Sequence, residues 1–556
     1  MAGLAITFGS GAMTNNIKDI GNSACIVSIG SNTTAAHPII GFEVKRAVRK
    51  GTKLIVINPR KIKLVEHADL WLRLRPGTDV ALIMGMIRVI LEEGLQDNTF
   101  IEERCRDFEA FEESLKEFPI DKVENITGVP RSQIIEAARL YATARPATIL
   151  YTLGITEHTH GTDGVLSLAN LAMVTGNVGK SGAGVNPLRG QNNVQGACDM
   201  GALPGSFPGY QSVDVPAVRE KFEKAWGCSL NPKTGLALTE MFQEAYNKNL
   251  KAIYLIGEDP VLSEPDMNHT IKALHNLDFF VVQDIFLTET AKQAQVVLPA
   301  VGPGVDEGTF TNTERRIQRV RKAISPPGES KTPWEVLCLI AKRLGKHGFD
   351  YTNPRQIWDE IASVTPSMAG ISYERLEKGG IQWPCPNPEH PGTPILHVNQ
   401  FTCGEGKFVP LHYRLSAELP DEDYPLILTT ERSLFHYHTG TMTRRVPGLN
   451  KLRSEELVEI NPKDAASLGI SNGEIVTVYS RRGNVTTRAK VTEDSPPGVV
   501  SMTFHFAESP TNALTNSALD PIAKTPELKF CAVRIDKIAI PISTVNSPSG
   551  ENNRLK

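Results

Sequence analysis

The sequence predicts an α/β protein in which two related Rossmann-like units precede a C-terminal β-barrel. The first observation is a strand–helix–strand pattern, with apolar runs at 24–30 and 53–58 on either side of an amphipathic stretch at 38–50. The second observation is a repeat of this pattern between 251 and 284. The third is a change after residue 424 to short strands at close spacing, which is typical of a small barrel.

Length and composition describe an ordinary globular protein of several domains. The chain has 556 residues, and its net charge of -3 predicts no general attraction to nucleic acid or to anionic membranes. Eight cysteines stand singly without a CxxC pair, which indicates neither a disulfide framework nor a zinc or iron–sulfur site. The single cysteines favour a reducing cytoplasm as the compartment. No apolar run is long enough to span a membrane, and the first residues do not resemble a signal peptide.

Further elements complete the first unit. The sequence predicts a strand at 70–74, a helix from Pro76 to about Glu93, a helix at 130–143 and a buried strand at 148–153. Ligands of parallel sheets bind beyond the carboxyl ends of the strands. The residues at these positions are Gly30, Asn32, Asn58, Arg60, Gly77, Asp79, Gly154, Ile155 and Thr156.

Two weaker signals lie in the same unit. The GxGxxG fingerprint of NAD-binding turns is absent, and Gly11 belongs to a Gly-Ser-Gly run that lacks both the third glycine and a preceding strand. His158 and His160, in the predicted loop 154–161, could ligate a metal ion. No third ligand is close in sequence, and a plain strand-end loop is therefore the favoured interpretation.

Polar residues follow the strands of the second unit at positions equivalent to those of the first. They are Gly257, Glu258 and Asp259 after one strand, and Gln283 and Asp284 after the next. Carboxylates at these positions suit sugar hydroxyls or the edge of a guanine, whereas NAD binding requires a glycine-rich turn. Beyond this unit, the sequence predicts a polar loop at 307–316, a linker at 326–332 and a helix at 334–344.

The stretch 184–203 has no usable hydrophobic period and is predicted to be a binding loop between the two units. Arg189 is its only full charge before Asp199, and it stands among glycine, asparagine and glutamine residues that include Gly190, Gln191 and Asn193. A guanidinium among amide donors and acceptors is suited to holding an anion or a ring rich in heteroatoms.

The C-terminal half begins with a boundary rich in proline and glycine. The predicted domains are 1–191, 192–330, a connecting region at 331–423, the barrel at 424–542 and a disordered tail at 543–556. The barrel strands are predicted at 426–429, 457–460, 475–479, 485–491 and 499–504. A loop at 431–445 gathers hydrogen-bonding side chains, among them Arg432, His436, His438, Thr439 and Thr441.

Three motifs in order give a family resemblance over nearly the whole chain. They are NPLRGQNNVQGACDMG at 186–201, HYHTGTMTRR at 436–445, and PTNALT at 510–515 together with TPELK at 525–529. The sequence resembles the molybdopterin oxidoreductases, and within them the alpha subunits of formate dehydrogenases.

The resemblance implies a bis(molybdopterin guanine dinucleotide) cofactor with molybdenum or tungsten. This group would lie between the two α/β domains, beneath a C-terminal double-psi β-barrel. Arg189 would bind the formate carboxylate with Gln191 beside it, because a guanidinium offers parallel donors to a carboxylate. The implied partners are formate, carbon dioxide and electron-transfer subunits of iron–sulfur, flavin or hydrogenase type. The residues expected to contact the cofactor are Gly11, Gly30, Asn32, Asn58, Arg60, Gly77, Asp79, Gly154, Ile155, Thr156, Gly190, Asn193, Gly257, Glu258, Asp259, Gln283, Asp284, Thr288, Arg432, His436, His438, Thr439, Thr441, Asn512 and Lys529.

Two features of the family are not found in this sequence. Family members begin with a cysteine-ligated Fe4S4 domain, and a selenocysteine or cysteine followed by histidine ligates their metal. The first residues here align just after that ligand pair, and no residue of the chain is assigned as a metal ligand. We therefore expect an amino-terminal truncation at a selenocysteine codon read as a stop, and a polypeptide that is inactive by itself. A subunit split into two chains is the alternative.

Two other functions stay open at the level of sequence. A nitrate reductase of the same family would use similar cofactor contacts, although an arginine in the substrate loop favours formate. A non-catalytic subunit that binds the cofactor would account for the missing ligand. Assays of formate against nitrate, with analysis of metal and pterin, separate these alternatives.

Overall fold

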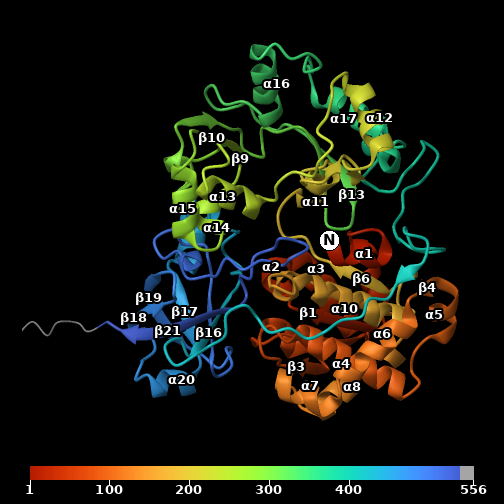
Figure 1. The fold of residues 1–556 in the computed structure, drawn as a ribbon, viewed down its shortest axis with the longest axis vertical. Helices are drawn as coiled ribbons and strands as arrows, with labels where there is room; N and C mark the ends of the chain where they lie inside the picture. Colours follow the sequence, from red (N-terminus) through yellow and green to blue (C-terminus); the bar gives the residue numbers. More distant parts are fainter. Residues whose placement is uncertain (539–556) are drawn as a thin grey trace, which may run out of the picture.

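The computed structural model describes residues 1–538, and the first α/β unit lies at the lower right of Figure 1. The five parallel strands of its central sheet have the order β3-β2-β1-β5-β6. Their bounds are β1 (Cys25–Ile29), β2 (Lys53–Ile57), β3 (Leu70–Leu72), β5 (Ala147–Tyr151) and β6 (Gly184–Pro187). The helices of the unit are α1 (Ala2–Phe8), α2 (Thr33–Ala36), α3 (Pro38–Arg49), α4 (Asp79–Glu92), α5 (Asn98–Arg104), α6 (Phe108–Ser114), α7 (Ile120–Thr127), α8 (Arg131–Thr143), α9 (Leu153–Thr156) and α10 (Gly161–Val174).

Helices cover both faces of this sheet, so its strands are apolar at nearly every position. Val27 and Ile55 point to the core formed with α4, α8 and α10. Their neighbours Ile26 and Leu54 point to the opposite core, formed with α3. A sheet buried on both faces needs continuous apolar runs, which is the pattern that predicted these strands.

The stretch 184–203 is more regular than the predicted loop. It contains the buried strand β6 and the helix α11 (Val194–Asp199), with irregular backbone at 188–193 and 200–203. Asn186 fixes β6, because its Nδ2 donates to Thr148 Oγ1 at 2.7 Å and its Oδ1 accepts from the Asn15 amide at 3.1 Å. Hydrogen bonds of a buried side chain therefore stabilise this strand, and a search for hydrophobic periodicity misses it.

The second α/β unit is smaller and lies at the upper left of Figure 1. Its three parallel strands have the order β11-β10-β9, and α13 and α15 pack with them in one apolar core. Its elements are α13 (Leu238–Tyr246), β9 (Ala252–Ile256), α14 (Pro260–Ser263), α15 (Met267–His275), β10 (Phe279–Asp284) and β11 (Val296–Pro299). The segment before them contains β7 (Ser206–Phe207), β8 (Gln211–Ser212) and α12 (Pro216–Trp226), and α12 lies beside α17 (Pro354–Val364) at the upper right of Figure 1.

Two segments predicted to be plain loops contain regular structure. The loop at 154–161 includes part of the single-turn helix α9. The loop at 307–316 is a β-hairpin in which β12 (Gly308–Thr311) pairs antiparallel with β13 (Arg316–Val320). The hairpin depends on a tertiary neighbour, because β13 also pairs with the distant strand β14 (Ile381–Gln382).

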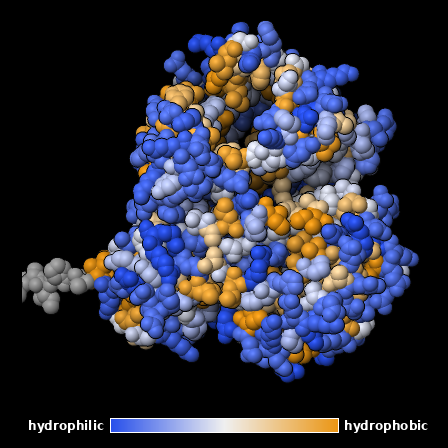
Figure 2. All heavy atoms as spheres, in the orientation of Figure 1, coloured by the Kyte–Doolittle hydropathy of each residue, from blue (hydrophilic) through white to orange (hydrophobic). Residues whose placement is uncertain are grey.

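The connecting region 331–423 ties the other parts together and has little sheet of its own. Its elements are α16 (Pro333–Arg343), α17 (Pro354–Val364), α18 (Tyr373–Leu376), β14 and β15 (Gly406–Lys407). β15 pairs with β4 (Cys105–Arg106) of the first unit. Figure 2 shows apolar side chains over α16 and along the seam above the first unit, while most of the remaining surface on this face is hydrophilic. No helix within residues 1–538 combines the length and apolar character required of a membrane span.

The C-terminal part is a closed barrel with strand order β16-β20-β17-β19-β18-β21. Its elements are β16 (Leu426–Thr430), α19 (Pro447–Leu452), β17 (Leu457–Ile460), α20 (Pro462–Ser467), β18 (Ile475–Tyr479), β19 (Asn484–Val491), β20 (Val499–Met502) and β21 (Cys531–Lys537). All five predicted strands are present, and β21 is a sixth that the turn pattern did not indicate. The predicted tail at 543–556 and the end of the predicted barrel range lie outside the described residues.

Candidate functional site

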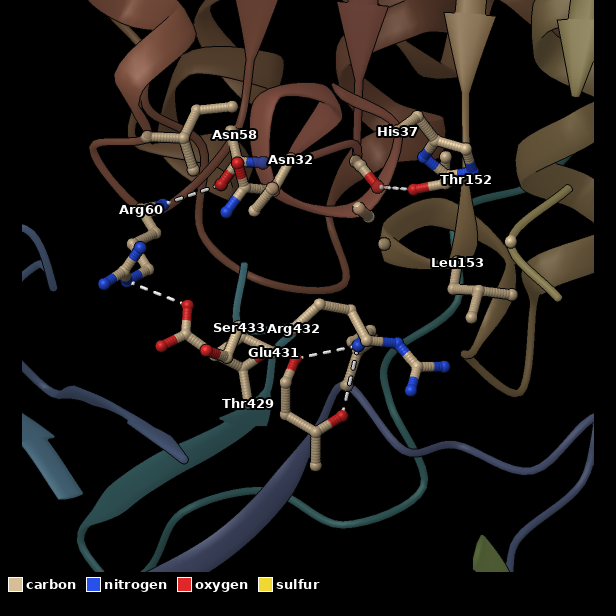
Figure 3. Close-up of a pocket in the computed structure, with 18 of the residues that line it drawn as sticks. Asn32, His37, Asn58, Arg60, Thr152, Leu153, Thr429, Glu431, Arg432 and Ser433 are labelled. Carbon is tan, nitrogen blue, oxygen red and sulfur yellow. Dashed lines mark hydrogen bonds and ion pairs between the residues drawn. The ribbon is translucent and has the colours of Figure 1, made fainter. Parts of the chain in front are cut away.

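A cavity of about 650 Å³ lies where the strand ends of the first unit face the barrel. In Figure 3, Asn32, Asn58 and His37 approach it from the first unit, while Glu431 and Arg432 approach it from the barrel loop. This volume is typical of a small-molecule site. The predicted site residues that line the cavity are Gly30, Asn32, Asn58, Arg60, Gly77, Asp79, Gly154, Arg189, Gly190, Gln191, Arg432, His436, His438 and Lys529.

Two glycines bring the loops after β1 and β5 into backbone contact. The Gly154 amide donates to the Gly30 carbonyl oxygen at 3.0 Å. A Cβ atom on Gly30, which has φ +55°, would lie 2.6 Å from the Ile155 nitrogen, and one on Gly154 would lie 2.4 Å from the Gly30 oxygen. Only glycine permits this approach, which leaves the edge of the sheet free of side chains at that point.

Arg189 is held at its backbone and at one edge of its guanidinium. Its amide donates to Thr313 Oγ1 at 2.9 Å, and its carbonyl oxygen accepts from His37 Nε2 at 3.0 Å. The guanidinium Nε donates to Gln195 Oε1 at 3.2 Å. Its Nη2 is buried and has no hydrogen-bond partner among residues 1–538, so a strong donor is left for a ligand.

Arg60 joins the end of β2 to the barrel. Its Nε lies 3.0 Å from Glu431 Oε2 and its Nη2 lies 2.5 Å from Glu459 Oε2. Burial raises the pKa of Glu431 to about 7 even though Arg60 opposes the shift. Burial also disfavours ionised Glu459, but the charges of Arg60 and Lys490 outweigh it and its pKa is lowered. The wall of the cavity is thus an ion cluster that spans two domains.

Two further cations of the barrel reach the cavity. Lys529 Nζ donates to the Thr430 carbonyl oxygen at 2.7 Å and pairs with Glu157 at 3.3 Å, and burial lowers the pKa of this amine. The Arg432 guanidinium lies 4.2 Å from the ring centre of Phe504. Its Nη1 is another buried donor that finds no partner in the described chain. Unpaired guanidinium donors beside a buried ammonium are typical of sites that hold phosphate or carboxylate groups.

The barrel histidines contribute hydrogen bonds to the wall of the cavity. His505 Nδ1 donates to the His438 carbonyl oxygen and its Nε2 accepts from the Ser433 amide at 3.1 Å. His436 Nε2 donates to the Arg453 carbonyl oxygen at 2.7 Å. Burial lowers the pKa of His438 to about 4 and that of His505 to about 3, so both rings are neutral near pH 7.

The strand ends of the second unit do not line the cavity. Gly257 and Glu258 are exposed, and a Cβ on Gly257 would meet no atom within 4 Å. Asp259 Oδ1 accepts a hydrogen bond from the Thr290 backbone amide at 3.0 Å and another from Thr290 Oγ1 at 2.6 Å. Gln283 Oε1 accepts from Tyr254 at 2.7 Å, Asp284 Oδ1 accepts from its own loop, and Thr288 Oγ1 accepts from the Ala291 amide.

The remaining predicted contacts also lie outside the cavity. Asn193 Oδ1 accepts from the Thr311 amide at 2.9 Å, and Asn512 Nδ2 donates to the Leu262 carbonyl oxygen at 2.8 Å. Gly11 lies against Met1, Ile155 and Thr156 form part of α9, and the hydroxyls of Thr439 and Thr441 bond to each other at 2.9 Å.

His37, Glu431 and His158 are among the cavity-lining residues that were not predicted to take part in the site. Neither His37 nor Glu431 was named as a candidate; Glu431 directly follows β16 and opens the loop 431–445, whereas His37 lies between the helices α2 and α3. His158 was interpreted as a strand-end residue; its Nε2 donates to the Gly154 carbonyl oxygen at 3.1 Å, and its Nδ1 lies 3.6 Å from Glu527. For Glu431 and His158, the position after a predicted strand was the available signal.

Comparisons with known families agree along most of the chain. The family described as molybdopterin oxidoreductase matches residues 3–343, and that described as molydopterin dinucleotide binding domain matches residues 426–532. The second match coincides with the closed barrel.

Several relatives carry formate dehydrogenase names. The F420-dependent formate dehydrogenase subunit alpha of Methanocaldococcus jannaschii is 52% identical over 541 residues, which are 97% of this chain and 80% of that protein. Subunit alpha of F420-dependent formate dehydrogenase 2 of Methanococcus maripaludis is 49% identical, with the same coverage. Formate dehydrogenase H of Escherichia coli is 41% identical over 563 residues, 100% of this chain and 79% of that protein.

One solved structure resembles the whole fold. Acetylene hydratase from Pelobacter acetylenicus aligns with a TM-score of 0.77 and 24% identity, covering 96% of this chain and 80% of that one. At this identity the likeness shows the fold alone. It confirms the predicted fold class of mixed α/β domains with a C-terminal barrel.

Proposed function

The chain belongs to the molybdopterin oxidoreductase family, and from this premise we propose that it is the catalytic subunit of a formate dehydrogenase. The reaction converts formate to carbon dioxide, two electrons and a proton. Identities of 41 to 52% to three proteins with formate dehydrogenase names support this assignment.

The observation that carries the proposal is the state of Arg189 in the cavity. Its guanidinium is fixed at Nε, while Nη2 is buried and unpartnered within the described part of the chain. A carboxylate is the small anion that best matches such donors, because both partners are planar and can bond in parallel. We assign Arg189 as the anchor of the formate carboxylate and Gln191, which lines the same cavity, as its neighbour.

The cavity fits part of a molybdopterin guanine dinucleotide. Arg432 and Lys529 would hold its phosphates, since both are buried cations and Arg432 has an unpaired donor. Asn32 and Asn58 would bond to the polar edges of the ring systems. When bound, the cofactor with molybdenum or tungsten would accept the two electrons of formate.

The second nucleotide arm is proposed to lie on the second unit. The open strand end at Gly257 and Glu258 has the room that an extended group requires, and the Glu258 carboxylate suits the donor edge of a guanine. The other predicted contacts on this unit, such as Asp259, would act by holding the loop in shape.

The chain's own residues supply positioning and a controlled electrostatic environment. Anchoring formate at Arg189 fixes the direction of its C–H bond, and orientation of this kind accounts for a large part of many rate accelerations. His438 stays neutral near pH 7, so the positive charge at the cavity comes from arginine and lysine side chains, among them Arg189, Arg432 and Lys529. A low local dielectric strengthens these interactions.

Electrons would leave through partner subunits. The relatives named as subunit alpha indicate an assembly of more than one chain, and those of 48 to 52% identity are named F420-dependent. We therefore propose a partner subunit that passes electrons to F420, of the flavin or iron–sulfur type.

The test uses the native holoenzyme, purified without oxygen together with its associated subunits. Formate oxidation and nitrate reduction are assayed with viologen dyes, and metal, pterin and released guanine nucleotide are quantified. We expect formate oxidation with two guanine nucleotides per molybdenum or tungsten. Nitrate reduction without formate oxidation, or a preparation without pterin, would contradict the proposal.

A further inference from the structure

A chain of side-chain hydrogen bonds runs from Arg189 away from the cavity into the protein. Arg189 Nε donates to Gln195 Oε1 at 3.2 Å, and Gln195 Nε2 donates to Asp199 Oδ1 at 2.8 Å. Gln195 and Asp199 are 1% and 0% exposed. Both residues lie on α11, one helical turn apart, so the helix presents them on the same face.

Asp199 is fixed by neutral donors and not by a cation. Tyr210 donates its hydroxyl to Oδ1 at 2.8 Å, and Trp383 donates Nε1 to Oδ2 at 2.7 Å. No lysine or arginine within residues 1–538 forms an ion pair with this carboxylate. Burial raises its pKa to about 6, and the donors of Gln195, Tyr210 and Trp383 oppose the shift. All three donors are directed at the two carboxylate oxygens, so the Asp199 side chain acts as a hydrogen-bond acceptor.

An acceptor at this place decides which way the Gln195 amide points. The amide has a donor end and an acceptor end, and only the donor end can face an ionised carboxylate. The acceptor end must then face Arg189, where it binds Nε–H. With Nε engaged, the side edge of the guanidinium is occupied and the end edge remains for an anion.

We infer that Gln195 and Asp199 are positioning residues that hold the Arg189 guanidinium with its end edge toward the substrate carboxylate. The inference rests on the proposed role of Arg189 in binding formate. A neutral amide in direct contact orients the guanidinium without neutralising it, and the negative charge of Asp199 is kept one residue further away. A carboxylate in direct contact would compete with the substrate for the same cation.

The test measures binding of sodium formate to the dithionite-reduced holoenzyme, which cannot take further electrons from formate. Calorimetric Kd values are compared for the wild type, Gln195→Glu and Gln195→Leu between pH 6 and pH 8. We expect Gln195→Leu to raise Kd about tenfold throughout this range, because a charged hydrogen bond is lost. We expect Gln195→Glu to raise Kd at least about tenfold at pH 8 and less at pH 6, where the added carboxyl takes up a proton beside Asp199.

Controls separate positioning from folding. Gln243→Glu makes the same change on the exposed face of α13 and is expected to leave Kd within about twofold of the wild type. Thermal unfolding of every variant reports stability independently. Asp199→Asn is a further variant. In it, Trp383 Nε1 could face an amide donor in place of a carboxylate oxygen, so its Kd is interpreted only if thermal unfolding shows a folded protein.

The outcomes distinguish the two proposals. If both Gln195 variants bind formate like the wild type while Arg189→Lys does not, the positioning role is overturned and the proposed function stands. If the wild type binds no formate, or Arg189→Lys binds it unchanged, the proposed function itself fails. A lower unfolding temperature without any pH-dependent change in Kd would show that Gln195 acts only in the fold.

Discussion

The two α/β units share a strand–helix–strand pattern, yet their strand ends have different surroundings. In the first unit the loops after β1, β2 and β5 are covered by the barrel and enclose a cavity. In the second unit the loop after β9 is open at Gly257 and Glu258, while Asp259 is bonded internally to Thr290. A repeated topology therefore supplies two possible binding edges, and the neighbour across each edge decides how enclosed it is.

The surroundings of two equivalent glycines, one after β1 and one after β9, show this difference. Gly30 and Gly257 both have positive φ, at +55° and +65°. An added Cβ would meet the Ile155 nitrogen at 2.6 Å in the first case and no atom within 4 Å in the second. Both backbones require glycine for the turn, but only the first also requires it for close packing.

The largest expected effect is the loss of formate turnover on replacing Arg189 by lysine. Lysine keeps the charge but lacks the fork of parallel donors, so we expect kcat/KM for formate to fall by about a hundredfold. Viologen-linked assays measure kcat/KM for formate on holoenzyme preparations with the same cofactor content. The control is Arg139→Lys, on an exposed pair with Glu93, which should change kcat/KM less than about twofold. A fall smaller than about fivefold for Arg189→Lys would show that Arg189 is not the main anchor.

The glycine pair gives the next largest effect, on stability. We expect Gly30→Ala to lower the free energy of unfolding by about 3 kcal/mol or more, since strain at positive φ adds to a backbone clash. Gly257→Ala introduces only the strain at positive φ and should lower the free energy of unfolding by about 1 kcal/mol. Unfolding of the two variants in parallel measures the difference. Equal losses would mean that the contact between the loops after β1 and β5 has little energetic weight.

The ion cluster of the enclosed site predicts a dependence on pH. The pKa of Glu431 is raised from 4.5 to about 7, so between these values the folded protein holds a proton that the unfolded chain has lost. This group therefore lowers the stability of the wild type as pH rises through that window. Relative to the wild type, Glu431→Gln should gain up to about 1.4 kcal/mol per pH unit between pH 5 and pH 7.

Thermal unfolding at pH 5, 6 and 7 measures this gain. The matched control is Glu474→Gln on the barrel surface, where backbone and Lys537 hydrogen bonds hold the pKa below its ordinary value. That variant should show no gain as pH rises. A constant difference between Glu431→Gln and the wild type would indicate that Glu431 stays ionised throughout.

The smallest expected effect tests the open strand end of the second unit. Removing the Glu258 carboxylate in Glu258→Ala should lower the bound guanine nucleotide by about threefold under limiting cofactor, the equivalent of one solvent-exposed hydrogen bond. Nucleotide released by acid from the purified protein measures it. Glu220→Ala, an exposed glutamate on α12, is the control. Unchanged content in both variants would leave the second unit without its proposed nucleotide contact.

The sequence determined the parts of this protein that depend on local periodicity. Continuous apolar runs gave β1, β2 and β5, and alternating residues with turn signals gave five barrel strands. Arg189 was predicted to bind an anion because it is the only full charge before Asp199 in a stretch of glycine and amide residues without a hydrophobic period. The motifs around that arginine and in the barrel loop also predicted the family, which the family matches confirm.

Only the tertiary structure decided which of these residues meet. β6 is stabilised by the side-chain hydrogen bonds of Asn186, and the pairing of β21 closes the barrel, so neither leaves a periodic signal. The contact of Arg60 with Glu431 joins residues more than 350 positions apart, and Asp199 orients Arg189 only through the intervening Gln195. The energy of such contacts lies in pairs brought together by folding, and no local pattern specifies the partner.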